Sequence, residues 1–75
     1  MKLTNLQIND RAKIIKIDAN KALKKRFNSF GIVKGEELRI KVYSLGKQTI
    51  EIEIGSTLVA MRDDEADKIK VEKLV

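Results

Sequence analysis

The chain contains no cysteine and no histidine among its 75 residues. Without thiolate or imidazole ligands, structural zinc and tight binding of soft metals are disfavoured. The same absence removes Cys–His and Ser–His nucleophile pairs, and no Gly-rich loop is present that could cradle a nucleotide. No disulfide can form, which is compatible with a reducing compartment. We therefore expect a protein that is not an enzyme.

Long apolar runs are also missing. No stretch approaches the roughly 18 residues that a membrane-spanning helix needs, and the first residues lack the apolar region of a secretory signal. We expect a cytoplasmic protein with no direct membrane insertion. A chain this short predicts a single domain over residues 1–75, with a modest core and little room for a deep catalytic pocket.

Proline is absent, and the only aromatic residues are Phe27, Phe30 and Tyr43. The core must therefore be aliphatic, and the turns must use Gly, Asn, Asp and Ser. Acidic residues are scarce at first: residues 1–35 hold nine Lys or Arg and two acids, a net charge of +7. Residues 36–75 hold seven Lys or Arg and nine acids, a net charge of −2. The basic excess favours an acidic protein, an anionic membrane face or nucleic acid as partner.

The segment after residue 18 has the pattern of an amphipathic helix. Asp18 or Asn20 can cap its N-terminus, because either side chain accepts hydrogen bonds from the first free N–H groups. Its opposite face is basic. The apolar stripe, which we expect to lie in the core, consists of Leu23, Phe27 and Phe30.

Glycines mark the turns of the chain. Gly31 suits the left-handed position after a helix, where Ile32 would pack back on Phe27. Residues 33–36 suit a type II turn with Gly35 at the position that needs a positive φ. The four structural turn glycines are Gly31, Gly35, Gly46 and Gly55.

Strands are predicted on both sides of this helix. Residues 11–17 are rich in isoleucine, and their broken alternation indicates a bulge. Residues 38–43 and 49–54 alternate cleanly around a three-residue loop at 45–47, which predicts a hairpin. In that register the inner pairs are Val42–Ile50, Ile40–Ile52 and Leu38–Ile54, and the outer pairs are Lys41–Glu51 and Arg39–Glu53. Opposite charges at such positions contribute about 0.2–1 kcal/mol each.

The rest of the chain continues this meander. A third strand is predicted over residues 57–62, followed by an acidic helical turn at 63–67 and a last strand that contains Ile69 and Val71. The order is strand, helix, three strands, helical turn, strand. Five short strands around an aliphatic core predict a mainly β fold, a small and partly open barrel that hides strand edges.

This order of elements resembles the FeoA family over nearly the whole chain. The helix-and-turn motif of that family stands here as Phe27-Asn28-Ser29-Phe30-Gly31-Ile32-Val33-Lys34-Gly35. Its later motif is matched by Val59-Ala60-Met61-Arg62, Glu65-Ala66 and Ile69-Lys70-Val71, and its opening by Leu3, Leu6, Ala12, Ile14 and Ile17. The chain departs from the pattern where Phe27 and Phe30 replace leucines and Lys34 replaces a proline.

The resemblance implies an SH3-like barrel and a cytoplasmic accessory or regulatory role in ferrous iron uptake. The implied partner is the cytosolic, G-domain-bearing part of a membrane Fe(II) transporter (FeoB-like). The resemblance also associates the module with transition-metal handling, without an agreed metal site. No cofactor is expected, other than a weakly bound divalent transition metal.

Two surfaces are predicted to contact the partner. One is the basic helix face, with Lys21, Lys24 and Lys25 and with Arg26 at its flank; the other is the hairpin tip, with Tyr43, Leu45 and Lys47. The alternatives are that the basic helix face is simply exposed to solvent and that Leu45 folds over the barrel mouth.

The weak candidates for a metal site are Asp63, Asp64, Glu65 and Asp67. Their spacing matches no calcium loop, and acids that open a helical turn are explained by the helix dipole. The alternative function is a basic barrel that binds nucleic acid, although no aromatic cluster offers a stacking platform. The oligomeric state is left open.

Overall fold

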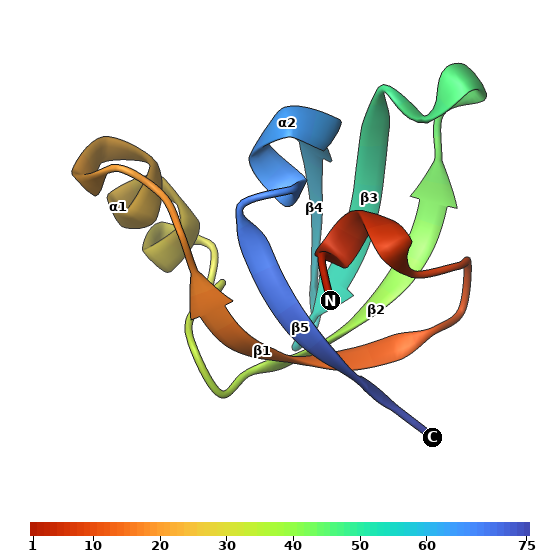
Figure 1. The fold of residues 1–75 in the computed structure, drawn as a ribbon, viewed down its shortest axis with the longest axis horizontal. Coiled ribbons are helices and arrows are strands. Elements are labelled where there is room, and N and C mark those ends of the chain that lie inside the picture. Colours follow the sequence, from red (N-terminus) through yellow and green to blue (C-terminus); the bar gives the residue numbers. More distant parts are fainter.

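The computed structural model describes residues 1–75 and is dominated by antiparallel strands (Figure 1). Short 3-10 turns at Leu3–Asn5 and Leu45–Lys47 accompany the main elements. Those elements are β1 (Arg11–Ile17), α1 (Lys21–Ser29), β2 (Glu37–Tyr43), β3 (Thr49–Ile54), β4 (Thr57–Arg62), α2 (Asp63–Ala66) and β5 (Ile69–Leu74). This is the predicted order, and it confirms the mainly β fold with one helix between the first two strands.

The five strands form one sheet with the order β4-β3-β2-β1-β5. The sheet bends strongly on itself, so that α2 lies over one end while α1 projects beyond β1 (Figure 1). Because β1 pairs with both β2 and β5, the first strand joins the central meander to the end of the chain. Neither helix has the length and hydrophobicity that a membrane-spanning helix requires.

The core lies inside this bent sheet and is almost wholly aliphatic. All 16 buried residues are hydrophobic, and no charged or polar residue is buried among them. Strand alternation supplies most of them, as in β3, where every second residue is buried. Phe27 is the only buried aromatic residue and α1's only contribution to the fully buried set.

Helix α1 begins and ends at the residues that the sequence indicates. Asn20 caps the N-terminus, where its Oδ1 accepts from the Leu23 N–H at 2.8 Å. At the other end the Ile32 N–H donates to the Phe27 carbonyl at 2.9 Å and the Gly31 N–H to the Asn28 carbonyl at 3.0 Å. With Gly31 at φ +83°, these two bonds form a Schellman ending.

The turn after the helix has the type II features that were predicted. The Glu36 N–H donates to the Val33 carbonyl at 3.1 Å, and Gly35 has φ +94°. Gly46 and Gly55 also have positive φ values. A residue with a Cβ would be strained in the left-handed region, which favours glycine there.

The burial prediction for Phe30 was wrong. Its side chain is 45 % exposed, whereas Phe27 is 1 % exposed. Phe30 is the last residue of the helical turn, and the chain reverses at Gly31 immediately after it. The reversal directs Ile32 into the core at this end of the helix. Ile32, and not Phe30, is therefore the buried residue that follows Phe27.

The predicted hairpin register is correct in one half and wrong in the other. Leu38, Arg39 and Ile40 pair as expected, but a bulge between Ile40 and Val42 places Val42 opposite Glu51. Tyr43 consequently pairs with Ile50, and the predicted pairs Val42–Ile50 and Lys41–Glu51 do not form. The extra residue exposes Val42 and turns Tyr43 toward the barrel interior.

Candidate functional site

A groove hollows the surface beside α1. It lies between one face of that helix, the end of β1 and the connection that leaves the helix, and it has a volume of about 790 Å³. We call it the lysine groove, and define it by its lining residues: Ile15, Lys16, Ile17, Asp18, Lys21, Lys24, Lys25, Asn28, Ile32, Val33 and Lys34.

An irregularity in β1 makes the floor of the lysine groove apolar. The register of β1 with β5 shifts between Ile14 and Lys16, which confirms the predicted bulge. Ile15, the residue at the shift, is 43 % exposed, and Ile17 is partly buried. Val33 and the buried Ile32 complete the floor from the other side.

Lysines form the rim of the lysine groove. Lys21, Lys24 and Lys25 come from α1, while Lys16 and Lys34 come from β1 and the type II turn. The single acidic residue in the lining is Asp18, whose Oδ1 lies 3.3 Å from Lys16 Nζ. The other four lysines take part in no ion pair, so their charge is available to a ligand.

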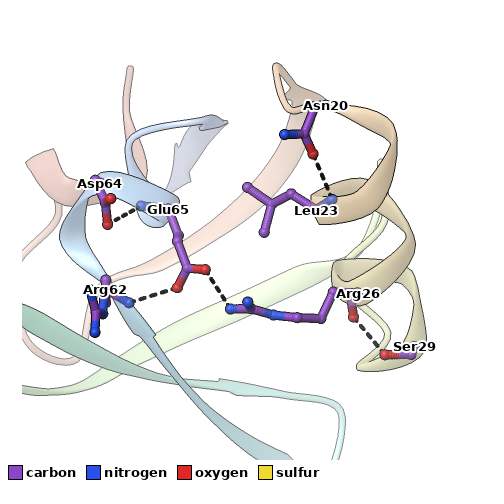
Figure 2. A network of polar contacts seen from close by, with 7 residues as sticks. All are labelled: Asn20, Leu23, Arg26, Ser29, Arg62, Asp64 and Glu65. Carbon is purple, nitrogen blue, oxygen red and sulfur yellow. Dashed lines mark hydrogen bonds and ion pairs between the residues drawn. The ribbon is translucent and has the colours of Figure 1, made fainter.

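Arg26, the fourth predicted cation of the helix, faces away from the lysine groove. It reaches α2, where its Nη2 lies 2.5 Å from Glu65 Oε2 (Figure 2). The second oxygen of Glu65 accepts from the Arg62 N–H at 3.1 Å. Arg26 therefore joins α1 to the barrel, while the lysines of the same helix face solvent.

The hairpin tip with Tyr43, Leu45 and Lys47 lies at the other end of the molecule from α1 (Figure 1). Leu45 is fully exposed, so it does not fold over the barrel mouth. Lys47 Nζ lies 5.1 Å from the centre of the Tyr43 ring, a cation–π distance. The structure thus separates the two predicted contact surfaces.

Tyr43 itself belongs more to the barrel than to the tip. It is partly buried, and its hydroxyl donates a hydrogen bond to the Leu6 carbonyl. Burial raises the pKa of the Tyr43 phenol above its usual value of 10.0, and the negative charge of Asp10 adds to the increase.

The acidic residues of α2, and Asp67 directly after it, are occupied by hydrogen bonds within the protein. Asp63 and Asp64 each accept from the next backbone N–H, and Asp67 accepts from the Thr4 hydroxyl at 2.5 Å. Together with the Glu65 contacts, these bonds point the four carboxylates at different partners. No three acidic side chains come together in an arrangement that could hold a metal ion.

The sequence did not identify the groove floor or two of its rim lysines. Ile15, Ile17 and Val33 are ordinary strand and turn residues by pattern, and Lys16 and Lys34 are far apart in sequence. The one signal was the broken alternation of residues 11–17, which predicts that an isoleucine turns outward at the bulge.

The architecture defines a class before any relative is considered: a small five-stranded antiparallel barrel with one projecting helix and a charged groove. A structure of Stenotrophomonas maltophilia FeoA complexed with zinc, described as an SH3 domain protein, superposes with a TM-score of 0.83 and 30 % identity. The match covers 96 % of this chain and 89 % of that one. The fold is therefore an SH3-like barrel.

Sequence comparison gives the family. The FeoA domain model matches residues 1–73, and the chain belongs to the FeoA family. A candidate Fe(2+) transport protein A of Campylobacter jejuni is 38 % identical over 71 residues, which cover 95 % of this chain and 96 % of that protein. FeoA of Chlorobium tepidum superposes with a TM-score of 0.94 and 32 % identity over 100 % of this chain and 71 % of that one. The chain is thus a ferrous iron transport accessory protein and not an enzyme.

Proposed function

We propose that this chain is a cytoplasmic protein that binds the cytosolic, G-domain-bearing part of a membrane Fe(II) transporter. Its membership of a ferrous iron transport family supports a role beside such a transporter. The observation that carries the proposal is the lysine groove, because it combines an apolar floor with four unpaired lysines. Apolar burial gives a contact its affinity, and complementary charge gives it specificity and speed of association.

The hairpin tip offers a second contact. Leu45 has no neighbour that shields it, and a fully exposed leucine on a loop can enter a hydrophobic pocket of a partner. Lys47 adds a positive charge beside it. The tip lies at the other end of the molecule from α1, which lines the lysine groove, so each surface can be tested without disturbing the other (Figure 1).

Binding of nucleic acid has less support from the structure. No aromatic residue lines the lysine groove, so bases would find no stacking surface there. The donor set for a metal ion is also poor, because the chain has no His or Cys and its α2 carboxylates diverge. Protein contact is therefore the function that these residues serve best.

The test is a titration of isotope-labelled protein with the cytosolic domain of the ferrous iron transporter from the same organism. We expect amide shifts at the lysine groove and at residues 43–47. The double variant Lys24→Glu/Lys25→Glu and the single variant Leu45→Asp should each weaken the complex, and higher salt should weaken it further. All three residues are exposed, so the barrel should remain folded.

The matched control is Lys2→Glu/Lys68→Glu, which changes the net charge equally at two exposed lysines outside the groove. This control should bind almost as well as the unaltered protein. An absence of shifts at high concentration would remove the proposed partner. Unchanged affinity in both test variants would instead remove these two surfaces.

A further inference from the structure

The end of β1 has a strand partner on only one side. Pairing with β2 is confined to Arg11, Ala12 and Lys13, whereas pairing with β5 continues as far as Ile17. The last contacts on the β2 side are two backbone hydrogen bonds of Ile14. Its carbonyl accepts from the Gly35 N–H at 2.8 Å, and its N–H donates to the Glu36 carbonyl at 2.9 Å. Beyond Ile14 the chain that leads into β2 has turned away.

The free side of this strand end opens into the lysine groove. The backbone N–H of Asp18 donates to the Lys68 carbonyl at 2.7 Å, on the β5 side. Since alternate residues of an antiparallel strand direct their backbone groups to opposite sides, the N–H and C=O of Ile17 point the other way. That is the side on which residues 32–34 line the groove.

We propose that the lysine groove binds an extended, acidic and aliphatic segment of a protein partner, which adds as a short strand beside the end of β1. The unpaired backbone groups of Ile17 supply main-chain hydrogen bonds, as in other complexes in which a peptide extends a sheet edge. This inference rests on the proposed function in one respect, since the transporter's cytosolic part is the protein expected to supply the segment.

Each part of the groove selects one property of this segment. The floor of Ile15, Ile17 and Val33 accommodates aliphatic side chains. The lysines on both walls, Lys21 and Lys24 on one and Lys34 on the other, select carboxylates on either side of the apolar residues. In an extended peptide that alternates the two kinds of residue, the aliphatic side chains point to one face and the carboxylates to the other.

An anionic bilayer fits the same charge but not the shape. A membrane surface is nearly flat on this scale and offers no backbone groups to pair with Ile17. The bulge, the open strand edge and the concave floor all favour a peptide, and charge alone would not distinguish the two partners.

The probe is a short capped peptide of alternating isoleucine and aspartate, titrated into the isotope-labelled full chain. The control peptide has lysine in place of aspartate. We expect shifts at residues 15–18 and 32–34 and slower amide exchange at Ile17 with the acidic peptide alone. Lys24→Glu/Lys25→Glu should weaken binding by about tenfold, and the control Lys2→Glu/Lys68→Glu by less than about twofold.

A second pair of variants tests the floor. Ile15→Gln removes an aliphatic side chain from the groove, and Ile8→Gln makes the same change at an exposed isoleucine outside it. Only Ile15→Gln should weaken the peptide complex. Equal behaviour of the two variants, or binding of both peptides alike, would overturn the proposed recognition.

Other occupants give different results. Shifts of the groove residues with phosphatidylglycerol vesicles, and none with the peptide, would assign the groove to lipid headgroups and overturn the proposal. Shifts on concentration of the protein alone would assign it to a second copy, with the same consequence.

If the transporter domain binds elsewhere and the peptide does not bind, this inference fails and the proposed function stands. If the peptide binds and the transporter domain does not, the proposed function fails and the peptide site stands.

Discussion

Phe27 and Phe30 lie one helical turn apart, yet only Phe27 is in the core. Phe27 fills the space between α1 and the barrel, where it is the helix's one fully buried residue. Phe30 caps the helix and remains 45 % exposed, because Ile32 enters the core after the reversal at Gly31. The two phenylalanines should therefore respond very differently to truncation.

We predict that Phe27→Ala lowers the free energy of unfolding by about 3–5 kcal/mol, because it leaves a cavity under the helix. Such a loss is a large part of the roughly 5–15 kcal/mol that stabilises a small domain. Phe30→Ala is the control and should change stability by about 0.5 kcal/mol or less. Chemical denaturation measures both, and equal losses would contradict the assignment of Phe27 alone to the core.

Tyr43 provides a prediction about pH. It is the only tyrosine of the chain, so phenolate absorbance reports on it alone. Because burial, with the charge of Asp10, raises its folded pKa above 10.0, the folded state keeps its proton where the unfolded state loses it. This contribution to stability is fully present below pH 10.0 and is lost as pH rises through the folded pKa.

The measurement is an absorbance titration of the folded protein, with the denatured protein as reference. We expect the midpoint of the folded protein at the higher pH. In Tyr43→Phe, the fall in stability above pH 10.0 should be smaller. An equal or lower midpoint in the folded protein would contradict the burial of the phenol and its bond to Leu6.

At the level of elements, α1 depends on its connections more than on its own sequence. A helix of nine residues is marginal by itself, and this one buries a single side chain completely. The Asn20 cap and the Schellman ending satisfy its terminal backbone groups. The ion pair of Arg26 with Glu65 is its one charged contact with the barrel (Figure 2).

We predict that Arg26→Ala loosens α1 without unfolding the sheet. The loss should be about 0.2–1 kcal/mol, since Arg26 is half-exposed and the ion pair is screened by water. Hydrogen exchange should accelerate in residues 21–29 and stay unchanged in β2 and β3. Lys25→Ala, at an adjacent exposed lysine without an ion pair, is the matched control.

A double-mutant cycle with Glu65→Gln isolates the ion pair. The glutamine keeps an acceptor for the Arg62 N–H, so the change removes the charge and spares the cap of α2. A coupling energy near zero would show that the pair does not hold the helix.

For the whole molecule, β5 completes the barrel. Ile69 and Val71 of this strand are in the core, and the strand pairs with β1 over its full length. Its other neighbour is the N-terminus, where the Val71 N–H donates to the Met1 carbonyl at 2.8 Å. The first residues of the chain thus lie beside β5, its last strand.

We predict that deletion of residues 69–75 abolishes folding, because it uncovers the apolar side of β1 and removes two core residues. The loss of Ile69 and Val71, at about 2–5 kcal/mol for each truncated aliphatic side chain, removes a large part of the roughly 5–15 kcal/mol that stabilises a small domain. The deletion also removes every hydrogen bond between β5 and β1. Amide dispersion in an NMR spectrum measures the outcome. Deletion of the exposed Val75 alone should leave the spectrum unchanged, and a dispersed spectrum for the longer deletion would contradict the prediction.

Local chemistry was sufficient to predict the elements and their order. The limits of α1 follow from Asn20 and Gly31, because a cap needs a side-chain acceptor and a left-handed residue favours glycine. The alternation of β3 predicts its buried face, because successive side chains of a strand point to opposite sides. Neither feature depends on the rest of the molecule.

Tertiary packing decided the features that separate segments share. The bulge after Ile40 accompanies the turn of Tyr43 toward the barrel, where its hydroxyl donates to the Leu6 carbonyl. Likewise, Ile32 is in the core beside Phe27, while Phe30 stays exposed. The lysine groove joins β1, α1 and the type II turn, so its floor and its charge exist only after these elements have met. A strand or helix pattern reflects the preferences of one segment in isolation. The bulge, the exposure of Phe30 and the lysine groove depend on how two or more segments pack against each other.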